Sequence, residues 1–330
     1  MGENIIEIRG LTIEFRMRNG VIKAVNDVDF NIEKGKITAL VGESGSGKST
    51  LAYALLGLVN HPGIISAGKI FFKGEDILQF NKEKLRKYRW ESVAMIFQAA
   101  QNSLNPVMTI QDQMLETLKE HKGYVDAKES LKKIKELLEY VRLNPDRILK
   151  SFPHELSGGM KQRVIIAFSL LLDPEVIILD EPTTALDVIT QAYIFEILKS
   201  INKEKGITML LLTHDIGIVA KVADQVGVMY AGRIVESANV FDIFERPKHP
   251  YTQSLIKAAP SLVGDLKDVK SIMGTPPNLM DLPKGCAFHP RCFKAFDKCR
   301  QEKPVRTNFE INEFVECHLY SENLSQNLVN

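Results

Sequence analysis

The feature that most constrains the fold is a glycine-rich loop that directly follows a short apolar segment. Residues 36–42 (KITALVG) run into 42–50 (GESGSGKST), and residues 49–59 continue with a helical pattern. Glycines in such a loop let successive backbone N–H groups converge on phosphate oxygens at a helix N-terminus. The sequence therefore predicts a strand, a phosphate-binding loop and a helix, as at the start of a parallel α/β fold.

The side chains of this loop predict a site for ATP and Mg²⁺. Lys48 supplies a positive charge for the β- and γ-phosphates, and the Ser49 hydroxyl is suited to ligate Mg²⁺. The residues expected to contact the nucleotide are Gly42, Ser44, Gly45, Ser46, Gly47, Lys48, Ser49 and Thr50.

A second apolar segment ends in two acids. Residues 176–181 (VIILDE) predict a buried strand that delivers Asp180 to the edge of the sheet, where it can hold Mg²⁺ through water. Glu181 would then orient or deprotonate the attacking water. Together with the phosphate loop upstream, this pair predicts ATP hydrolysis.

A second anion-binding site is predicted at residues 156–163 (LSGGMKQR), where Ser157, Gly158 and Gly159 precede an apolar helix. Serine and glycine there offer an N-cap and free N–H donors. One chain does not need two phosphate sites for one ATP. We therefore expect this second site to face the γ-phosphate held by another subunit.

The remaining pattern indicates alternating strands and helices, hence a parallel α/β core with an N-terminal antiparallel β layer. Residues 115–141 have a helical pattern, residues 226–236 predict a hairpin, and prolines become frequent after Pro247. We expect an ATPase domain at 1–245, containing a helical subdomain at about 100–165, and a small extension at 246–330.

The net charge and the lengths of the apolar runs argue against two classes of protein, dedicated nucleic-acid binders and membrane-spanning chains. The 330 residues carry a net charge of +1, which lacks the basic footprint of a nucleic-acid binder. The strongest apolar run, residues 164–172, is shorter than the roughly 20 residues of a spanning helix, and the N-terminus lacks a signal-peptide core. We expect a cytoplasmic protein that reaches a membrane only through a partner.

The segment LSGGMKQR resembles the signature motif of ABC ATPases, and the other motifs of that family occur in order along the chain. The resemblance implies a P-loop NTPase (RecA-like) core with a helical signature subdomain, in which two subunits enclose ATP. It implies that Gln98 contacts Mg²⁺ and the attacking water, that His214 contacts the γ-phosphate and that Phe15 stacks on adenine. Gln162 would belong to the signature motif. Residues 184–187, which include Ala185 and Asp187, would form the D-loop at the dimer interface.

Residues 245–252 (ERPKHPYT), 285–292 (GCAFHPRC) and 103–106 (SLNP) resemble the oligopeptide and dipeptide importer ATPases. Ala99 and Ala100, after Gln98, differ from the acidic residue and proline frequent there. The resemblance implies a peripheral subunit at the cytoplasmic face of the membrane, working with a second, identical or related ATPase, two transmembrane permeases and an extracellular substrate-binding protein. Nickel or oligosaccharide import, or a non-transport ATPase acting on nucleic acid, are the alternatives; no nucleic-acid partner is expected.

All four cysteines lie after residue 285, at Cys286, Cys292, Cys299 and Cys317. In a cytoplasmic chain such clustering indicates metal ligation rather than disulfides. Four thiolates can hold Zn²⁺ or an iron–sulfur cluster, and the close pairs usual for structural zinc are missing. The resemblance implies a [4Fe–4S] cluster; the alternatives are zinc, and unligated thiols or a transient disulfide.

Overall fold

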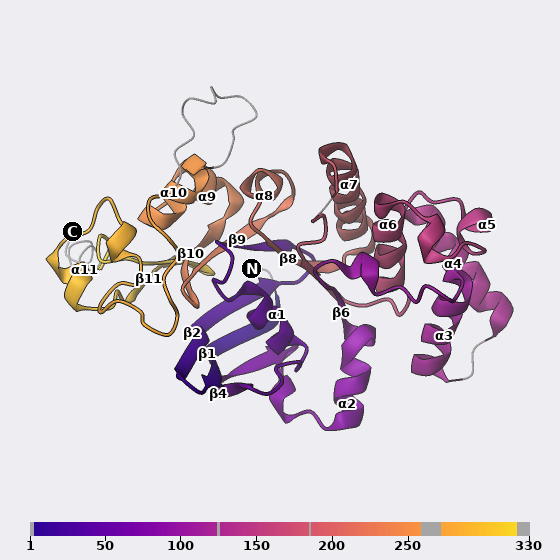
Figure 1. Ribbon diagram of the computed structural model, residues 1–330, viewed down its shortest axis with the longest axis horizontal. Helices are drawn as coiled ribbons and strands as arrows, with labels where there is room; N and C mark the ends of the chain where they lie inside the picture. Colours follow the sequence, from indigo (N-terminus) through magenta and orange to yellow (C-terminus); the bar gives the residue numbers. More distant parts are fainter. Residues whose placement is uncertain (1–2, 124–125, 185, 259–271, 322–330) are drawn as a thin grey trace. The chain divides into compact units, whose positions relative to one another are not determined.

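The computed structural model describes residues 3–123, 126–184, 186–258 and 272–321 (Figure 1). The chain forms two compact units. Unit 1 combines residues 1–79 with 212–330, and unit 2 is the intervening stretch 80–211. No helix in the described part of the chain combines the length and apolar character that crossing a membrane requires.

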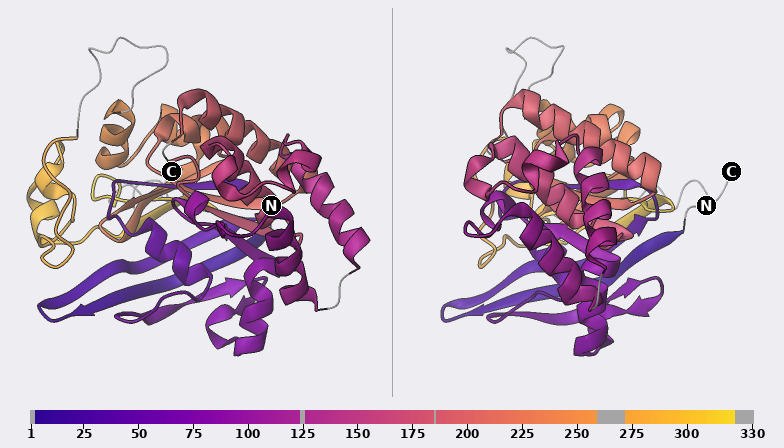
Figure 2. Two further views of the ribbon diagram at one scale, coloured as in Figure 1. Left: turned by 45° about the vertical axis from the view of Figure 1, so that its right-hand side comes forward. Right: turned by 90° about the vertical axis from the view of Figure 1, so that its right-hand side faces the viewer.

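Unit 1 begins with an antiparallel sheet in the order β2-β1-β4-β5. The two long strands β1 and β2 pair along most of their length, with Ile6 opposite Ile32 and Phe15 opposite Ile22 (Figure 2). Apolar residues of β1, such as Ile6, Ile8 and Ile13, are fully buried. The predicted N-terminal antiparallel layer is confirmed.

The second sheet of unit 1 contains the strand that leads into the phosphate loop. In this unit the strand order is β11-β12-β10-β9-β3. Strands β3 and β9 are parallel, and β9 and β10 form the predicted hairpin. Strand β12 pairs with β10, Val315 lying opposite Glu236, so the region after residue 245 supplies two strands to this sheet. The domain boundary near residue 245 remains a prediction.

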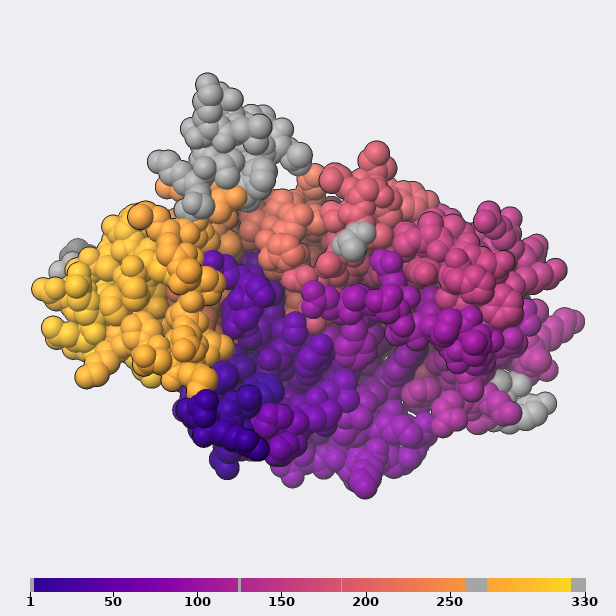
Figure 3. Space-filling model, in the orientation of Figure 1, coloured from indigo at the N-terminus to yellow at the C-terminus, as the bar shows by residue number. Residues whose placement is uncertain are grey.

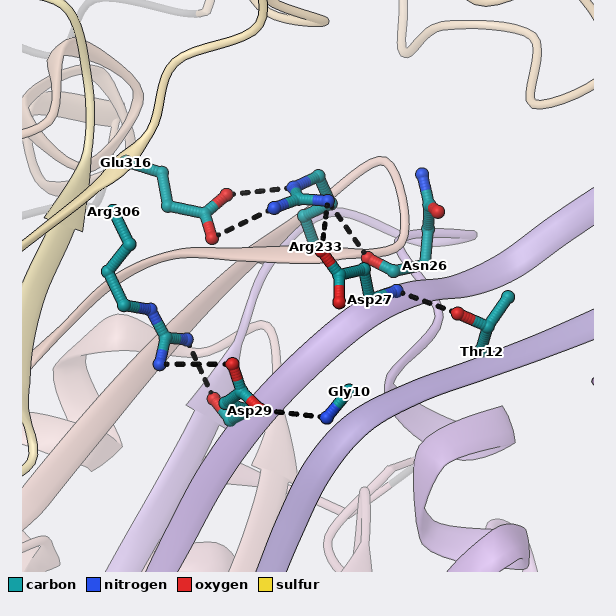
Figure 4. Close-up of polar contacts among 8 residues, drawn as sticks. All are labelled: Gly10, Thr12, Asn26, Asp27, Asp29, Arg233, Arg306 and Glu316. Atoms are coloured by element: carbon teal, nitrogen blue, oxygen red, sulfur yellow. Dashed lines mark hydrogen bonds and ion pairs between the residues drawn. The ribbon is translucent and has the colours of Figure 1, made fainter. Parts of the chain in front are cut away.

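Ion pairs fasten these C-terminal strands to β2 and β10 (Figure 4). Arg233 donates from Nε and Nη2 to the two carboxylate oxygens of Glu316, at 2.8 and 3.1 Å. Arg306 donates to the backbone oxygen of Asp29 at 2.9 Å. Glu316 is almost completely buried, so its charge depends on Arg233 for compensation.

Unit 2 pairs β6 and β7 in parallel, as the α/β pattern predicts, and surrounds them with helices. Polar N-caps set the helix starts: the side chains of Thr109, Asp126 and Ser157 each accept a hydrogen bond from a backbone N–H in the first turn. The helical pattern at 115–141 is two helices rather than one. Helix α3 ends at Gly123, whose φ of 72° a helix cannot continue.

The helix after the phosphate loop is also shorter than the sequence predicts. Helix α1 ends at Leu55, and Gly57 follows with a φ of 61°. The elements of unit 1 are β1 (Asn4–Met17), β2 (Gly20–Glu33), β3 (Ile37–Val41), α1 (Lys48–Leu55), β4 (Gly63–Phe72), β5 (Glu75–Asp76), η1 (Ile77–Gln79), α8 (Ile216–Val222), β9 (Gln225–Tyr230), β10 (Arg233–Asn239), α9 (Val240–Glu245), α10 (Pro250–Ala258), η6 (His289–Arg291), α11 (Asp297–Gln301), β11 (Arg306–Glu310) and β12 (Glu313–Glu316).

Unit 2 is mainly helical. Its elements are α2 (Lys82–Lys87), η2 (Tyr88–Ser92), β6 (Val93–Ile96), η3 (Ala100–Asn102), α3 (Ile110–Lys122), α4 (Ala127–Tyr140), α5 (Pro145–Ile148), η4 (Pro153–Glu155), α6 (Gly158–Ser169), β7 (Val176–Asp180) and α7 (Val188–Lys205). Strand β8 (Thr208–Thr213) carries the chain back into unit 1.

Candidate functional site

The phosphate loop lies between the buried strand β3 and helix α1, in the predicted order. Lys48 is buried, and its Nζ donates to the backbone oxygens of Gly42 and Glu43 at 2.7 and 3.0 Å. The loop therefore curls around the ammonium group that is expected to meet the phosphates. Ser49 and Thr50 follow in the first turn of α1.

Two glycines of the loop have no room for a side chain. A Cβ on Gly42 would lie 2.1 Å from the backbone oxygen of Met229, and one on Gly47 would lie 2.1 Å from that of Ala24. Gly47 also has a φ of 110°, which side chains rarely allow. The backbone of β2 and β9 thus fixes the path of the loop. Gly45, by contrast, faces open space.

A cavity of about 300 Å³ opens beside Ser44, Gly45 and Ser46. Its wall also includes Ile22 of β2, which lies opposite Phe15 of β1. Phe15 is half-buried and its ring abuts Gly63, where a Cβ would lie 3.0 Å from Phe15 Cε1. The structure thus gives Phe15 a fixed place in unit 1, and its adenine-stacking role remains a prediction.

Unit 2 brings two predicted catalytic residues together. Gln98 Nε2 donates to Glu181 Oε2 at 3.2 Å, and Thr184 Oγ1 donates to the same oxygen at 3.1 Å. Glu181 has a φ of 47°, in the left-handed region that non-glycine residues seldom occupy. Such strain is often found at functional positions. The Glu181 carboxylate is therefore oriented by two neutral donors, one of which, Thr184, the sequence assigns to the D-loop and not to Glu181.

Asp180 ends strand β7 and is 1% exposed. It lies in unit 2 with Gln98, whereas Lys48 and Ser49 lie in unit 1. The predicted Mg²⁺ set of Ser49, Gln98 and Asp180 thus draws on both units, and it remains a prediction. Carboxylate, amide and hydroxyl oxygens are the donors that Mg²⁺ prefers.

The signature segment begins helix α6 as predicted. Ser157 Oγ accepts from the backbone N–H of Met160 at 3.3 Å, and Gln162 is buried. The next residues lie close to the D-loop and the first turn of α7. A Cβ on Gly158 would lie 3.4 Å from Leu186 Cδ2 of the D-loop, and one on Gly159 would lie 2.7 Å from Thr190 Cγ2 of α7. The structure therefore joins two motifs that the sequence treated as separate.

Asp187 begins helix α7 as its N-cap. Its Oδ1 accepts from the N–H of Thr190 at 2.9 Å and its Oδ2 from Thr190 Oγ1 at 2.7 Å. These hydrogen bonds, with that from the Thr190 backbone the largest cause, lower the pKa of Asp187. Ala185, also in the predicted D-loop, lies outside the described residues. Asp187 therefore fixes both the start of α7 and the side chain of Thr190.

His214 follows β8 in unit 1 and is exposed. The next residue, Asp215, caps helix α8 by accepting from the N–H of Ile218 at 3.1 Å. Its own N–H donates to Thr213 Oγ1 at 3.0 Å. The backbone on both sides of His214 is therefore fixed, and its contact with the γ-phosphate remains a prediction.

The sequence missed a set of residues that contacts the phosphate loop from the C-terminal region. Arg291 forms a bidentate ion pair with Glu43, and Tyr251 Oη accepts from the Glu43 N–H at 2.9 Å. Figure 3 shows the C-terminal region (orange and yellow) lying against the N-terminal strands (indigo) on one face of unit 1. Both residues lie in segments that resemble the peptide importers, 245–252 and 285–292, but that resemblance does not indicate a contact with the phosphate loop.

The four cysteines line one small cavity of about 10 Å³ in unit 1. That volume is close to one water molecule, too little for a four-iron cluster without movement of the thiols. Burial raises the pKa of Cys286 and Cys317 to about 11. Among the described residues, no group of three or more His, Cys, Asp or Glu side chains is arranged to hold a metal ion. The sulfur donors suit a metal, but the structure does not support the predicted cluster site.

Comparison with known proteins agrees with these features. Residues 25–184 match the family described as ABC transporter, and residues 235–299 match the family described as oligopeptide/dipeptide transporter, C-terminal region. Together the two matches include the phosphate loop, the signature segment and three of the four cysteines.

Curated relatives match along nearly the whole chain. A dipeptide transport ATP-binding protein, DppD, from Caldanaerobacter subterraneus subsp. tengcongensis is 45% identical over 318 residues, covering 96% of this chain and 98% of that protein. An oligopeptide transport ATP-binding protein, OppD, from Haemophilus influenzae is 42% identical, with 96% and 98% covered.

Solved structures show the same fold. A dimeric ATP-binding cassette in a post-hydrolysis state with ADP and phosphate has a TM-score of 0.64 at 28% identity, covering 71% of this chain and 98% of that one. The component cbiO1 of the transporter complex cbiONQ from Clostridium perfringens also has a TM-score of 0.64, at 30% identity, with 74% and 92% covered. The predicted P-loop NTPase fold is confirmed, and the chain belongs to the oligopeptide/dipeptide transporter family of ABC ATPases.

Proposed function

We propose that this chain binds and hydrolyses ATP to power the import of dipeptides or oligopeptides across a membrane. The observation that carries the proposal is similarity along the whole chain, 45% identity over 96% of its length, to a protein named for dipeptide transport. The two alternatives, import of nickel or oligosaccharides and action on nucleic acid, have no comparable support.

The residues of each unit supply separate parts of the reaction. Loop N–H groups and Lys48 bind the phosphates, and Glu181, held by Gln98 and Thr184, accepts a proton from the attacking water. Ser49, Asp180 and Gln98 would hold Mg²⁺, which supplies charge compensation at the β- and γ-phosphates. His214 would donate to the γ-phosphate as negative charge develops there.

The chain would act as a pair. Ser157, Gly158 and Gly159 expose N–H groups at the start of α6, where an anion is favoured. In the proposed pair, this end of each copy meets the γ-phosphate held by the other copy, which is identical or related. Hydrolysis then adds charge repulsion and lets the pair open.

A hollow in unit 2 offers a docking surface for the permease partner. It has a volume of about 350 Å³ and is lined by apolar and polar residues next to Gln98, among them Trp90, Phe97, Ser103, Met108 and Glu116. Phe97 is 42% exposed although it is a large apolar side chain. Permease contact here would move the segment that carries Gln98, and through it Glu181. In this arrangement the chain is bound at the cytoplasmic face of the membrane.

The four cysteines would hold an inorganic centre, either the [4Fe–4S] cluster implied by the resemblance or Zn²⁺. The four sulfur donors line one cavity, and either centre requires the thiols to move apart, because that cavity has a volume of only about 10 Å³. Anaerobic purification with iron, sulfide and zinc analysis, on wild type and Cys292→Ala, tests it. About four irons and four sulfides per chain, lost in the variant, are expected for the cluster; absence of every metal would refute the centre.

The function is tested by co-expressing the chain with its permease and substrate-binding proteins and reconstituting the complex in vesicles. Peptide uptake that requires ATP, and that is lost in Glu181→Gln with the complex still assembled, is the expected result. Competition with nickel and oligosaccharides defines the cargo. Recovery of RNA or DNA with the purified chain, in place of permease, would contradict the proposal.

A further inference from the structure

Hydrogen bonds from two described residues of the C-terminal region, Tyr251 and Arg291, converge on Glu43 of the phosphate loop. The Glu43 carboxylate accepts two hydrogen bonds from Arg291, Nη1 to Oε2 at 2.6 Å and Nη2 to Oε1 at 2.9 Å. Its N–H donates to Tyr251 Oη at 2.9 Å, and its carbonyl accepts from Lys48 Nζ at 3.0 Å. Glu43 therefore connects the phosphate-binding lysine to two side chains from beyond residue 245.

The guanidinium of Arg291 is fixed on its other edges as well. Its Nε donates to the backbone oxygen of Met273 at 2.9 Å, and Nη1 lies 3.5 Å from Tyr230 Oη. The Arg291 side chain is only 6% exposed, against 23% for Glu43. The hydrogen bond with Glu43 raises the pKa of Arg291 above its ordinary value. Arg291 is therefore charged at every physiological pH, and its position is set by contacts independent of the loop.

Tyr251 belongs to an aromatic cluster that continues towards Arg291. Its ring is fully buried and packs against Tyr230 and Phe288, with centroid distances of 4.6 and 5.3 Å. Phe288 is 1% exposed and lies three residues before Arg291. Both contacts to Glu43 thus arise from one packed core, so they cannot move independently of each other.

Electrostatics gives this arrangement a consequence for nucleotide binding. Glu43 places a negative charge in a loop that has to accept the negative phosphates of ATP. A bidentate guanidinium compensates a carboxylate and fixes its plane at the same time. Without Arg291, the Glu43 carboxylate would repel the phosphates or compete with them for Lys48, which already donates to the Glu43 backbone.

We propose that Arg291 is a positioning residue for nucleotide binding, which neutralises and orients Glu43 and thereby makes the ATP affinity of the phosphate loop depend on the C-terminal region. The inference rests on the proposed ATPase function and adds a residue to it. It is supported further by the cavity beside the loop, where Pro276, Pro277, Asn278 and Leu279 share a wall with residues 43–46.

The test measures the dissociation constant of ATP with Mg²⁺ for the full-length chain, and the KM and kcat of the assembled transporter. Arg291→Gln is expected to weaken ATP binding about tenfold, with a matching rise in KM and little change in kcat, because the loss precedes chemistry. Removing the stranded carboxylate as well, in Arg291→Gln/Glu43→Gln, should restore affinity to within about threefold of wild type. Arg291→Lys keeps the charge and loses the bidentate geometry, so its ATP affinity should lie between those of Arg291→Gln and wild type.

Arg233→Met is the matched control. It breaks another bidentate arginine–glutamate pair of the C-terminal region, with Glu316, which does not contact the loop. It should lower thermal stability and leave the ATP dissociation constant unchanged.

The inference is overturned if Arg291→Gln and Arg291→Lys bind ATP within twofold of wild type, if the double variant binds no better than Arg291→Gln, or if Arg233→Met weakens binding equally. A wild-type chain that neither binds nor hydrolyses ATP would instead refute the proposed function. Should Arg291→Gln fail to fold, the comparison of Arg291→Lys with Tyr251→Phe decides, because each removes one contact to Glu43 and retains the packed core. Wild-type affinity in both would overturn the inference.

Discussion

The close approach of Gly159 to Thr190 predicts that alanine is tolerated differently at the two adjacent glycines, Gly158 and Gly159. In Gly159→Ala, the new Cβ would lie 2.7 Å from Thr190 Cγ2, closer than a relaxed contact allows. Thr190 cannot turn away freely, because its Oγ1 donates to Asp187 at 2.7 Å. In Gly158→Ala, the nearest atom is the end of the flexible Gln101 side chain at 3.2 Å. We therefore expect Gly159→Ala to destabilise unit 2 and Gly158→Ala to be tolerated.

The magnitude follows from comparing the two alanine variants with each other. Both gain up to about 1 kcal/mol of helix propensity, since both positions lie in the first turn of α6. The difference between them therefore isolates the clash, which overpacking studies put at about 1–3 kcal/mol. In a chain of this size that corresponds to an apparent melting difference of about 2–10 °C.

Thermal unfolding followed by circular dichroism measures this difference, with ATP hydrolysis recorded separately because Gly159 is also a proposed nucleotide contact. Thr190→Ser provides the compensating change, since it removes Cγ2 and keeps the hydroxyl that donates to Asp187. Gly159→Ala/Thr190→Ser should regain most of the lost stability. The reasoning is wrong if the two alanine variants melt within 1 °C of each other, or if Thr190→Ser brings no recovery.

Three further predictions concern the ionisable residues Glu181, Arg233 and His249. Glu181→Gln should lower ATP hydrolysis by about 10²–10⁴-fold in single-turnover assays without abolishing ATP binding, and a loss below tenfold would contradict a base role. Arg233→Met should lower the free energy of unfolding in urea by roughly 3 kcal/mol, because it leaves the buried Glu316 carboxylate without its charge partner. The double variant Arg233→Met/Glu316→Leu should recover most of this free energy. No recovery would show that packing, and not charge compensation, was lost. Burial lowers the pKa of His249 to about 3, below the value of about 6.5 in an unfolded chain. The neutral, buried His249 therefore contributes fully to stability above pH 6.5, and this contribution is lost as the pH falls. Between pH 6 and 4, the free energy of unfolding of wild type should fall by about 1.4 kcal/mol per pH unit relative to His249→Gln. Urea-unfolding free energies that run parallel with pH in the two proteins would contradict this.

The sequence predicted the parts of the site whose geometry is local. The phosphate loop, the acids after β7 and the capped start of α6 each lie within one stretch of chain, and their glycine and capping signals identify them. Glu181 and Gln98 are both expected at the attacking water, but nothing in the sequence indicates their direct hydrogen bond or the left-handed backbone of Glu181.

What the sequence could not predict depends on residues far apart in the chain. Strand β4 is hard to recognise because its middle residues, 66–69, are exposed, and it is defined by pairing with β1. Arg291 reaches Glu43 across a separation of 248 residues. The grouping of the four cysteines is predicted from their positions along the chain, and the four thiols do line one cavity, but its small volume follows from packing that those positions do not describe.

The pairing of β12 with β10 has a consequence for how the protein is made. Strand β10 ends at Asn239 and its partner begins at Glu313. At the usual rate of synthesis, that interval takes on the order of 4–15 s, during which a nascent chain presents β10 as an open sheet edge. Open edges are the surfaces on which unfinished β-proteins associate. The edge of β10 therefore stays open to such association until Glu313–Glu316 has been synthesised and has paired with it.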